Sequence, residues 1–366
     1  MYRVIMVPLD GSPFGERAIP LALRIARHTG ASLELAHVFT STPWTPDVPA
    51  ADRLYTVAKE GMREELDRLI TRVATKGRVP VPVTVSLLEG EIVSALEAHV
   101  EARGVDLVVM TTHGRGGVSR AWLGSVADAL VRRLRIPVLL ARPGTVGRGG
   151  ADAPPVRKVL VPLDGSPFAE GVLDRALALG TPFRTHYLLL RVVTPIPTVR
   201  LQHGGKHARL DYADVEEQER QAQDYLAGVA ERIRRPGTPV NIRTIVHRQP
   251  ARAILNVARD SKPDLIALSA HGRGALGRIM LGSVADKVVR GAAVPTLVYR
   301  PVTAAVEDVE RVREGSAEMA ATARRRVRGE HRPNVDRGAI NSSRSSRKAR
   351  SSSAPRRSWD TSEHQT

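Results

Sequence analysis

The chain of 366 residues contains no cysteine. This excludes disulfides, thiolate catalysis and thiolate metal sites. Aromatic residues make up only 4% of the sequence, so Leu, Val, Ile and Ala must fill the hydrophobic cores. No apolar run approaches the ~18–20 residues of a membrane-spanning helix, and the first residues have the pattern of a strand rather than of a signal peptide. We therefore expect a cytoplasmic protein without membrane contact.

Basic residues outnumber acidic ones, 55 against 38, and the formal net charge is +17. Much of the excess lies after about residue 320, where Ser, Arg and Pro dominate. Such a segment buries too little apolar surface to fold, so we predict a disordered basic tail. One alternative for its arginine clusters at 324–328 and 344–350 is contact with nucleic-acid phosphates or an acidic surface, with an affinity that falls steeply as salt rises. We favour a solvated extension over a nucleic-acid-binding arm, because Trp359 is the one aromatic residue near these clusters.

An internal repeat organises the rest of the chain. The sequence VPLDGSPF at 7–14 returns at 161–168, and IPVLLARP at 136–143 returns as VPTLVYRP at 294–301. The segment 144–155 between the copies is rich in Gly and Pro, as is typical of a linker. We predict one domain at 1–143, a linker at 144–155, a second domain at 156–301 and the tail at 302–366.

Each copy alternates strand-like and helix-like segments. The predicted strands are 4–9, 33–39, 83–88, 105–110 and 136–141 in the first copy, and 159–163, 187–193, 240–246, 264–268 and 296–299 in the second. The first copy's helices are predicted at 12–28, 52–75, 91–103 and 125–134. Ser12 is expected to cap the first helix, Pro20 to break it and Gly30 to end it. Strands that alternate with helices indicate a parallel sheet covered on both faces.

Polar signatures follow the first and fourth strands of each copy. After the fourth strand come TTHGRGG at 111–117 and LGSVAD at 123–128, and the second copy has SAHGRG at 269–274 and LGSVAD at 281–286. Ligands of open parallel sheets bind at the carboxyl ends of the strands, where the strand order reverses. A glycine loop followed by a helix start suits phosphate, because backbone N–H groups and the helix dipole point at the anion.

This interpretation gives each residue a role. Phosphates would rest on the N–H groups around Gly114 and of Gly124 to Val126, Arg115 would neutralise charge, and Asp10 would bind a base or ribose. Purely structural roles remain open for the same residues. Asp10 could form a turn, Ser125 and Ser283 could be helix N-caps, and His113 could hydrogen-bond the backbone of its own loop.

Other chemistries find no support in the sequence. It has no Walker A lysine motif, no G-x-G-x-x-G after a first strand and no G-x-S-x-G elbow. His113 and His271 have no nearby second His or carboxylate pair at metal-ligand spacing.

The ordered motifs, found twice, resemble the universal stress protein family in its tandem form. The resemblance covers 1–143 and 156–301. It implies two Rossmann-like domains of the adenine nucleotide α-hydrolase-like type, each an open five-stranded parallel sheet of order 3-2-1-4-5. It also implies pairing of the two domains through their last strands, within one chain, and leaves a homodimer open. Its ATP-binding motif, G-x2-G-x9-G-[ST], fits Gly114, Gly124 and Ser125, but Thr111 and Ser269 replace the first glycine.

The resemblance and the loop argument together assign the nucleotide-binding residues. In the first copy they are Pro8, Leu9, Asp10, Val38, Met110, Thr111, His113, Gly114, Arg115, Gly124, Ser125 and Val126. In the second they are Pro162, Leu163, Asp164, Val192, Leu268, Ser269, His271, Gly272, Arg273, Gly282, Ser283 and Val284.

Three functional classes follow. The first is a nucleotide-binding stress-response protein that holds ATP, with or without magnesium, and at most hydrolyses it slowly, since no residue is placed to activate water. The second is an adenylate-forming enzyme. PLDGS at 8–12 argues against this class, because such enzymes have a Ser-Gly-Gly-x-Asp-Ser loop after the first strand. The third is a scaffold of the same fold that binds no nucleotide, which Thr111 and Ser269 support.

Overall fold

A computed structural model describes residues 1–40, 49–74, 80–112, 123–141, 156–180, 184–195, 213–235, 238–270 and 281–301. These residues all belong to one compact unit, Met1–Glu307. The first copy contains, in order, β1 (Val4–Leu9), the 3-10 helix η1 (Gly15–Ala18), α1 (Ile19–Thr29), β2 (Ser32–Phe39), α2 (Pro49–Ala74), β3 (Val83–Glu89), α3 (Ile92–Arg103), β4 (Leu107–Thr111), α4 (Ser125–Arg133) and β5 (Val138–Ala141). The second contains β6 (Lys158–Pro162), α5 (Pro167–Glu170), α6 (Leu173–Gly180), β7 (His186–Val193), α7 (Ala213–Ile233), β8 (Val240–Val246), α8 (Pro250–Ser261), β9 (Leu265–Ser269), α9 (Ser283–Gly291) and β10 (Thr296–Tyr299).

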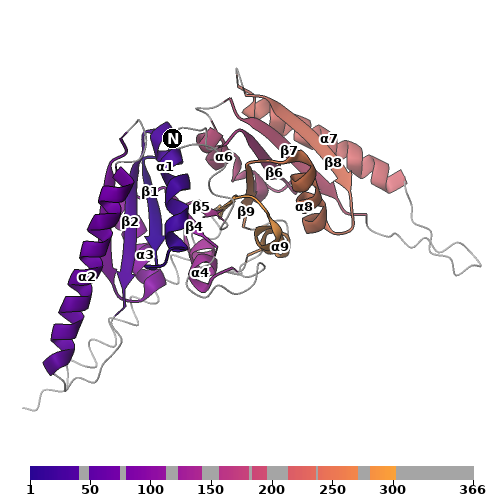
Figure 1. Ribbon diagram of the computed structural model, residues 1–366. Coiled ribbons are helices and arrows are strands. Elements are labelled where there is room, and N and C mark those ends of the chain that lie inside the picture. Colours follow the sequence, from indigo (N-terminus) through magenta and orange to yellow (C-terminus); the bar gives the residue numbers. More distant parts are fainter. Residues whose placement is uncertain are drawn as a thin grey trace, which may run out of the picture. The chain divides into compact units, whose positions relative to one another are not determined.

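The strands form one ten-stranded sheet of order β3-β2-β1-β4-β5-β10-β9-β6-β7-β8 (Figure 1). Within each copy every pairing is parallel, and both halves have the predicted order 3-2-1-4-5. The copies join through their last strands, which pair antiparallel with Leu297 opposite Leu139. The predicted fold and the pairing of the two domains within the chain are therefore confirmed.

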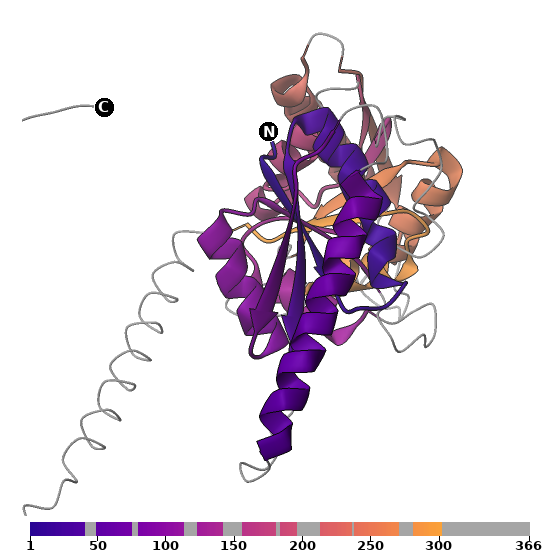
Figure 2. The same ribbon diagram turned by 60° about the vertical axis from the view of Figure 1, so that its left-hand side comes forward.

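Two hydrophobic layers cover the two faces of the sheet. One contains alternate strand residues such as Ile5 and Leu107 together with side chains of α1, α2, α6 and α7. The other contains the remaining strand residues, such as Met6 and Val108, with side chains of α3, α4, α8 and α9. The long helix α2 runs in front of the strands of the first copy in Figure 2. Both layers continue from one copy into the other, so the β5–β10 junction is buried on both faces.

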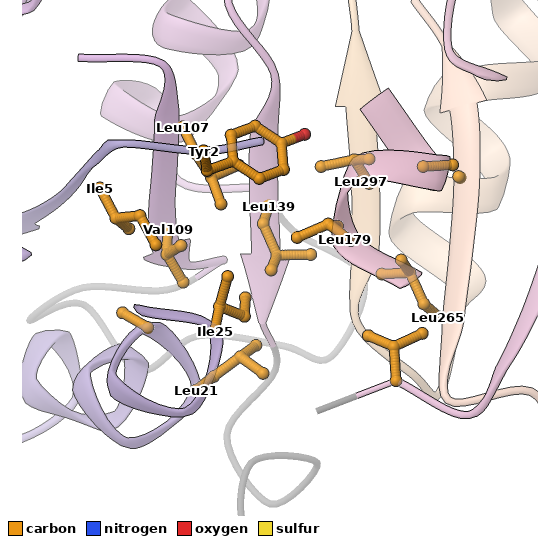
Figure 3. Packing of buried hydrophobic residues seen from close by; sticks show 14 of the residues in the cluster. Tyr2, Ile5, Leu21, Ile25, Leu107, Val109, Leu139, Leu179, Leu265 and Leu297 are labelled. Atoms are coloured by element: carbon orange, nitrogen blue, oxygen red, sulfur yellow. The ribbon is translucent and has the colours of Figure 1, made fainter. Parts of the chain in front are cut away.

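The close packing at this junction is shown in Figure 3, where Leu139 and Leu297 lie among Ile25, Leu179 and Tyr2. Leu139 and Leu297 are 1% and 0% exposed. At about 25 cal/mol per Å² of buried apolar surface, such side chains supply much of the free energy that holds the copies together.

The helix predicted at 12–28 is divided. In the first copy the chain forms a turn, then η1, then α1, which begins with Pro20 in its first turn. This confirms the break at Pro20, since proline lacks the N–H that a continuous helix would need. Ser12 is not the helix cap that was expected: Phe14 is the N-cap of η1, and the Ser12 Oγ accepts from the Gly15 N–H (3.2 Å) within the preceding turn. Gly30 ends α1 with a φ of 73°, a conformation that glycine adopts without strain.

The strand bounds predicted from the sequence agree with the structure to within two residues. No helix among the described residues is long and apolar enough to span a membrane. The predicted linker at 144–155 and the predicted tail at 302–366 lie outside the described residues.

Candidate functional site

The strand order reverses between β1 and β4, which are hydrogen-bonded neighbours in the first copy. From β1 the chain moves through β2 to β3 on one side, and β4 then pairs with β1 on the other. The same reversal lies between β6 and β9 in the second copy. Asp10 and Thr111 therefore follow adjacent strands at the same edge of the sheet, as the sequence predicts.

Asp10 and Asp164 each form the same turn after the first strand. The Asp10 Oδ1 accepts from the Ser12 N–H (3.0 Å) and from the Ser12 hydroxyl (2.6 Å). Asp164 makes the matching bonds to Ser166, at 2.9 and 2.6 Å. The turn role that was left open is thus present in both copies. It holds the carboxylate in a fixed position at the carboxyl edge of the sheet.

The side chains of Thr111 and Ser269 stand where the ATP-binding motif has its first glycine. Both are buried, with exposed fractions of 6% and 8%. The Ser269 hydroxyl donates to the main-chain carbonyl of Ala169 (3.3 Å) in α5. Strand alternation places Thr111 on the corresponding face, with Leu107 and Val109. The Ser269 hydroxyl therefore ties the end of β9 to the segment that follows β6.

The loop between the fourth strand and its helix is closed at its base by the main chain. In the first copy the Gly124 N–H donates to the Thr112 carbonyl (2.8 Å), and in the second the Gly282 N–H donates to the Ala270 carbonyl (2.7 Å). A Cβ on Gly124 would lie 3.3 Å from the Thr112 oxygen, tighter than most such contacts. This close approach explains why glycine stands at the start of the helix.

The helices α4 and α9 begin at this point, with Gly124 and Gly282 as their N-caps. The alternative in which Ser125 and Ser283 are N-caps is wrong: each serine is the first helical residue, and both are exposed. The first N–H groups of a helix have no acceptor within it, and a glycine cap offers no side chain to satisfy them. The Gly124 N–H, which the sequence assigns to phosphate, is instead used by the loop base, as is that of Gly282. The exposed helix start that follows each glycine is chemically suited to an anion.

The other predicted residues line the same edge or support it. Val38 is 9% exposed and lies near the end of β2, paired with Leu88, and Met110 packs in the same hydrophobic layer. Their counterparts Val192 and Leu268 lie in the corresponding layer of the second copy. Leu9 and Leu163 are buried, Pro8 and Pro162 are partly buried, and Val126 and Val284 are accessible residues in the first turns of α4 and α9.

Six predicted residues lie outside the described residues: His113, Gly114, Arg115, His271, Gly272 and Arg273. Their roles remain predictions. Among the residues that the structure describes, no group of three or more His, Asp or Glu side chains is arranged to hold a metal ion.

The sequence interpretation missed two side chains behind the Asp turns. His37, buried near the end of β2, donates from Nδ1 to the Leu9 carbonyl (2.9 Å). The second copy has Arg191 at the same position, with its guanidinium 5.4 Å from the centre of the Tyr225 ring. Tyr225 in turn donates to Glu170 (2.9 Å). A polar residue within an apolar strand was the signal for both, and the two copies differ in what this residue contacts: main chain at the end of β1 in the first and an aromatic ring of α7 in the second.

Fold and site together define a tandem, doubly wound α/β protein with a glycine-containing loop at each switch point. A family model described as "Universal stress protein family" matches residues 1–142 and 155–300. The chain belongs to the universal stress protein family.

Relatives support this assignment. A universal stress protein of Mycobacterium tuberculosis is 34% identical over 196 residues, which are 53% of this chain and 62% of the relative, so the match spans about three fifths of that protein's length. A second one from the same organism is 28% identical over 320 residues, covering 81% of this chain and 94% of the relative. The crystal structure of a universal stress protein from Archaeoglobus fulgidus has the same fold, with a TM-score of 0.57 at 18% identity, covering 82% of this chain and 98% of that one.

Proposed function

We propose that each copy binds an adenine nucleotide, with ATP as the favoured ligand, at the carboxyl edge between β1 and β4 or between β6 and β9. The observation that carries this proposal is the pair of matching loop bases, Thr112–Gly124 and Ala270–Gly282, each leading into a helix with an exposed start. Two copies retain this arrangement beside Asp10 and Asp164. The ATP-binding motif of the family supports it.

In this account the helix starts bind the phosphates through backbone N–H groups, and the Asp turn faces the base or ribose. The buried hydroxyl of Ser269 bonds the α5 segment, which supports the proposal that replacement of the motif's first glycine leaves the phosphate site open. Magnesium would accompany ATP. We propose slow turnover at most and a role in stress response in the cytoplasm.

The test is calorimetry of the stripped chain with ATP and magnesium, after any nucleotide that copurifies has been released and identified by chromatography. We expect two ATP molecules per chain. Tryptophan at the exposed Ser125 or Ser283 should fill one phosphate site, so Ser125→Trp and Ser283→Trp should each bind one. Ser94→Trp is the matched control, because Ser94 is an exposed serine in the first turn of α3, where the Glu91 carboxylate already accepts from the first N–H groups. It should still bind two.

The scaffold alternative makes a different prediction. If no nucleotide copurifies and none binds, the proposed site is refuted and the protein is better described as a structural member of its family. If binding occurs but is unchanged in both Ser→Trp variants, the ligand lies elsewhere.

A further inference from the structure

The repeated Arg-Pro that follows the last strand has no role in the candidate nucleotide site. In the second copy this arginine is Arg300, directly after β10. Its Nη1 donates to the main-chain carbonyl of Arg132 (2.8 Å), in the last turn of α4. A side chain of the second copy thus holds the end of the helix whose start forms the first copy's candidate site.

Arg300 is also joined to the second candidate site through the main chain. The neighbouring residue, Tyr299, accepts from the Ala270 N–H (2.8 Å), and the Ala270 carbonyl accepts from the Gly282 N–H (2.7 Å) at the start of α9. These bonds form the base of the second glycine loop. Two hydrogen bonds therefore connect the backbone next to Arg300 with that loop.

On the other side, α4 is a rigid link from Arg132 to the first loop. It begins at Gly124, whose N–H bonds the Thr112 carbonyl (2.8 Å). Arg132 also makes a bidentate ion pair with Asp128 one turn earlier, at 2.8 and 2.9 Å. The hydrogen bond from Arg132 to Asp128 raises the arginine pKa, and the negative charge of Asp286, on α9 of the other copy, raises it further although partial burial opposes this.

We propose that the two candidate nucleotide sites are energetically coupled through Arg300, so that occupancy of one changes the affinity of the other. The inference rests on the proposed function. A continuous series of hydrogen bonds and one rigid helix join the bases of the two loops, from Thr112 and Gly124 to Ala270 and Gly282. Hydrogen-bond networks and rigid elements of this kind carry energetic coupling between sites, and substitutions along them change its size.

A thermodynamic cycle measures the coupling with ATP and magnesium on the full chain. Ser125→Trp reports the dissociation constant of the second site alone, and Ser283→Trp that of the first. If the sites are independent, the product of these two constants equals the product of the two stepwise constants of the unmodified chain. We expect the products to differ by about fivefold or more, the lower range of ordinary allosteric coupling.

The decisive variant is Arg300→Gln, combined in turn with each Ser→Trp change. In this background the two products of dissociation constants should agree to within about twofold, as they do for independent sites. Tyr2→Phe is the matched control. It removes another hydrogen bond between the copies, from the Tyr2 hydroxyl to the Arg175 carbonyl (2.9 Å), which contributes to neither loop base. Tyr2→Phe should retain the coupling of the unmodified chain.

The possible outcomes separate this inference from the function on which it rests. Two independent sites in the unmodified chain would overturn the coupling and leave nucleotide binding intact. Coupling that persists in Arg300→Gln, or that is lost equally in Tyr2→Phe, would refute the role of Arg300. Absence of any ATP binding would overturn the proposed function and the coupling together.

Discussion

Replacing Glu34 with alanine is expected to lower the free energy of unfolding by about 2–4 kcal/mol, as measured by chemical denaturation of the full chain. Glu34 lies within β2 and is 2% exposed. Its carboxylate accepts from the Ser86 hydroxyl (2.7 Å) and contacts the His99 Nε2 (2.5 Å) and the Arg103 Nε (3.4 Å). Alanine would leave the Ser86, His99 and Arg103 donors without their acceptor and would open a cavity between β2 and α3.

The second copy supplies the matched control for this prediction. Its equivalents of Glu34 and His99 are Leu188 and Val257, which pack in the apolar layer. The double variant Glu34→Leu with His99→Val should therefore remain within about 1 kcal/mol of the unmodified chain, because a buried ion pair can be exchanged for well-packed apolar groups at little cost. A loss below about 0.5 kcal/mol for Glu34→Ala alone would contradict the assigned role.

The same cluster gives the stability a pH dependence. Burial alone would raise the pKa of Glu34, but hydrogen bonds from Ser86 and His99 and the charges of His99 and Arg103 outweigh it, and the pKa is lowered. The stabilisation is thus complete above the ordinary glutamate pKa of about 4.3 and is lost as the pH falls through the lower folded value. As the pH falls through that range, the unmodified chain should lose stability relative to the double variant, which has no carboxylate at this position.

Leu297→Ala is expected to cost about 2–5 kcal/mol, because it removes a fully buried side chain at the junction of the two copies. Leu297 is opposite Leu139 in the antiparallel β5–β10 pair, and both belong to the layer shared by the copies. The loss should therefore extend beyond the mutated strand. Hydrogen exchange should rise in peptides that cover β5 as well as in those that cover β10.

Ile242→Ala is the control for the junction. Ile242 lies on β8, the last strand of the sheet among the described residues, and is 40% exposed. Its truncation should cost less than about 1 kcal/mol and leave the exchange of β5 unchanged. If Leu297→Ala accelerates exchange in β10 only, the two copies are not joined by one cooperative core.

The sequence predicts the strands well because most are short apolar runs bounded by polar or helix-forming residues, as in 4–9 and 159–163. The order of the strands and the pairing of the copies came from the family resemblance, and both are confirmed. The position of Asp10 beside the fourth strand follows from that order. The loop bases could be located from the repeated Gly-Ser pairs.

Other features depend on contacts that no local pattern encodes. The Arg300–Arg132 and Tyr2–Arg175 bonds join residues 168 and 173 positions apart, so neither spacing nor periodicity indicates them. The cap at Gly124 rather than Ser125 is set by the close approach of the Thr112 carbonyl, which the three-dimensional arrangement determines. The sequence did contain a signal for the buried Glu34 cluster, because Glu34 is a carboxylate in a strand where the second copy has Leu188. The partners of Glu34 could not be predicted, because they come from two other elements, β3 and α3.

The most direct test of the central claim is a crystal structure of the full chain with magnesium and a non-hydrolysable ATP analogue. The account predicts analogue density in both copies, with phosphates on the N–H groups that begin α4 and α9 and with the nucleoside toward Asp10 and Asp164. Density that avoids both helix starts, or crystals grown at saturating analogue that contain none, would contradict it.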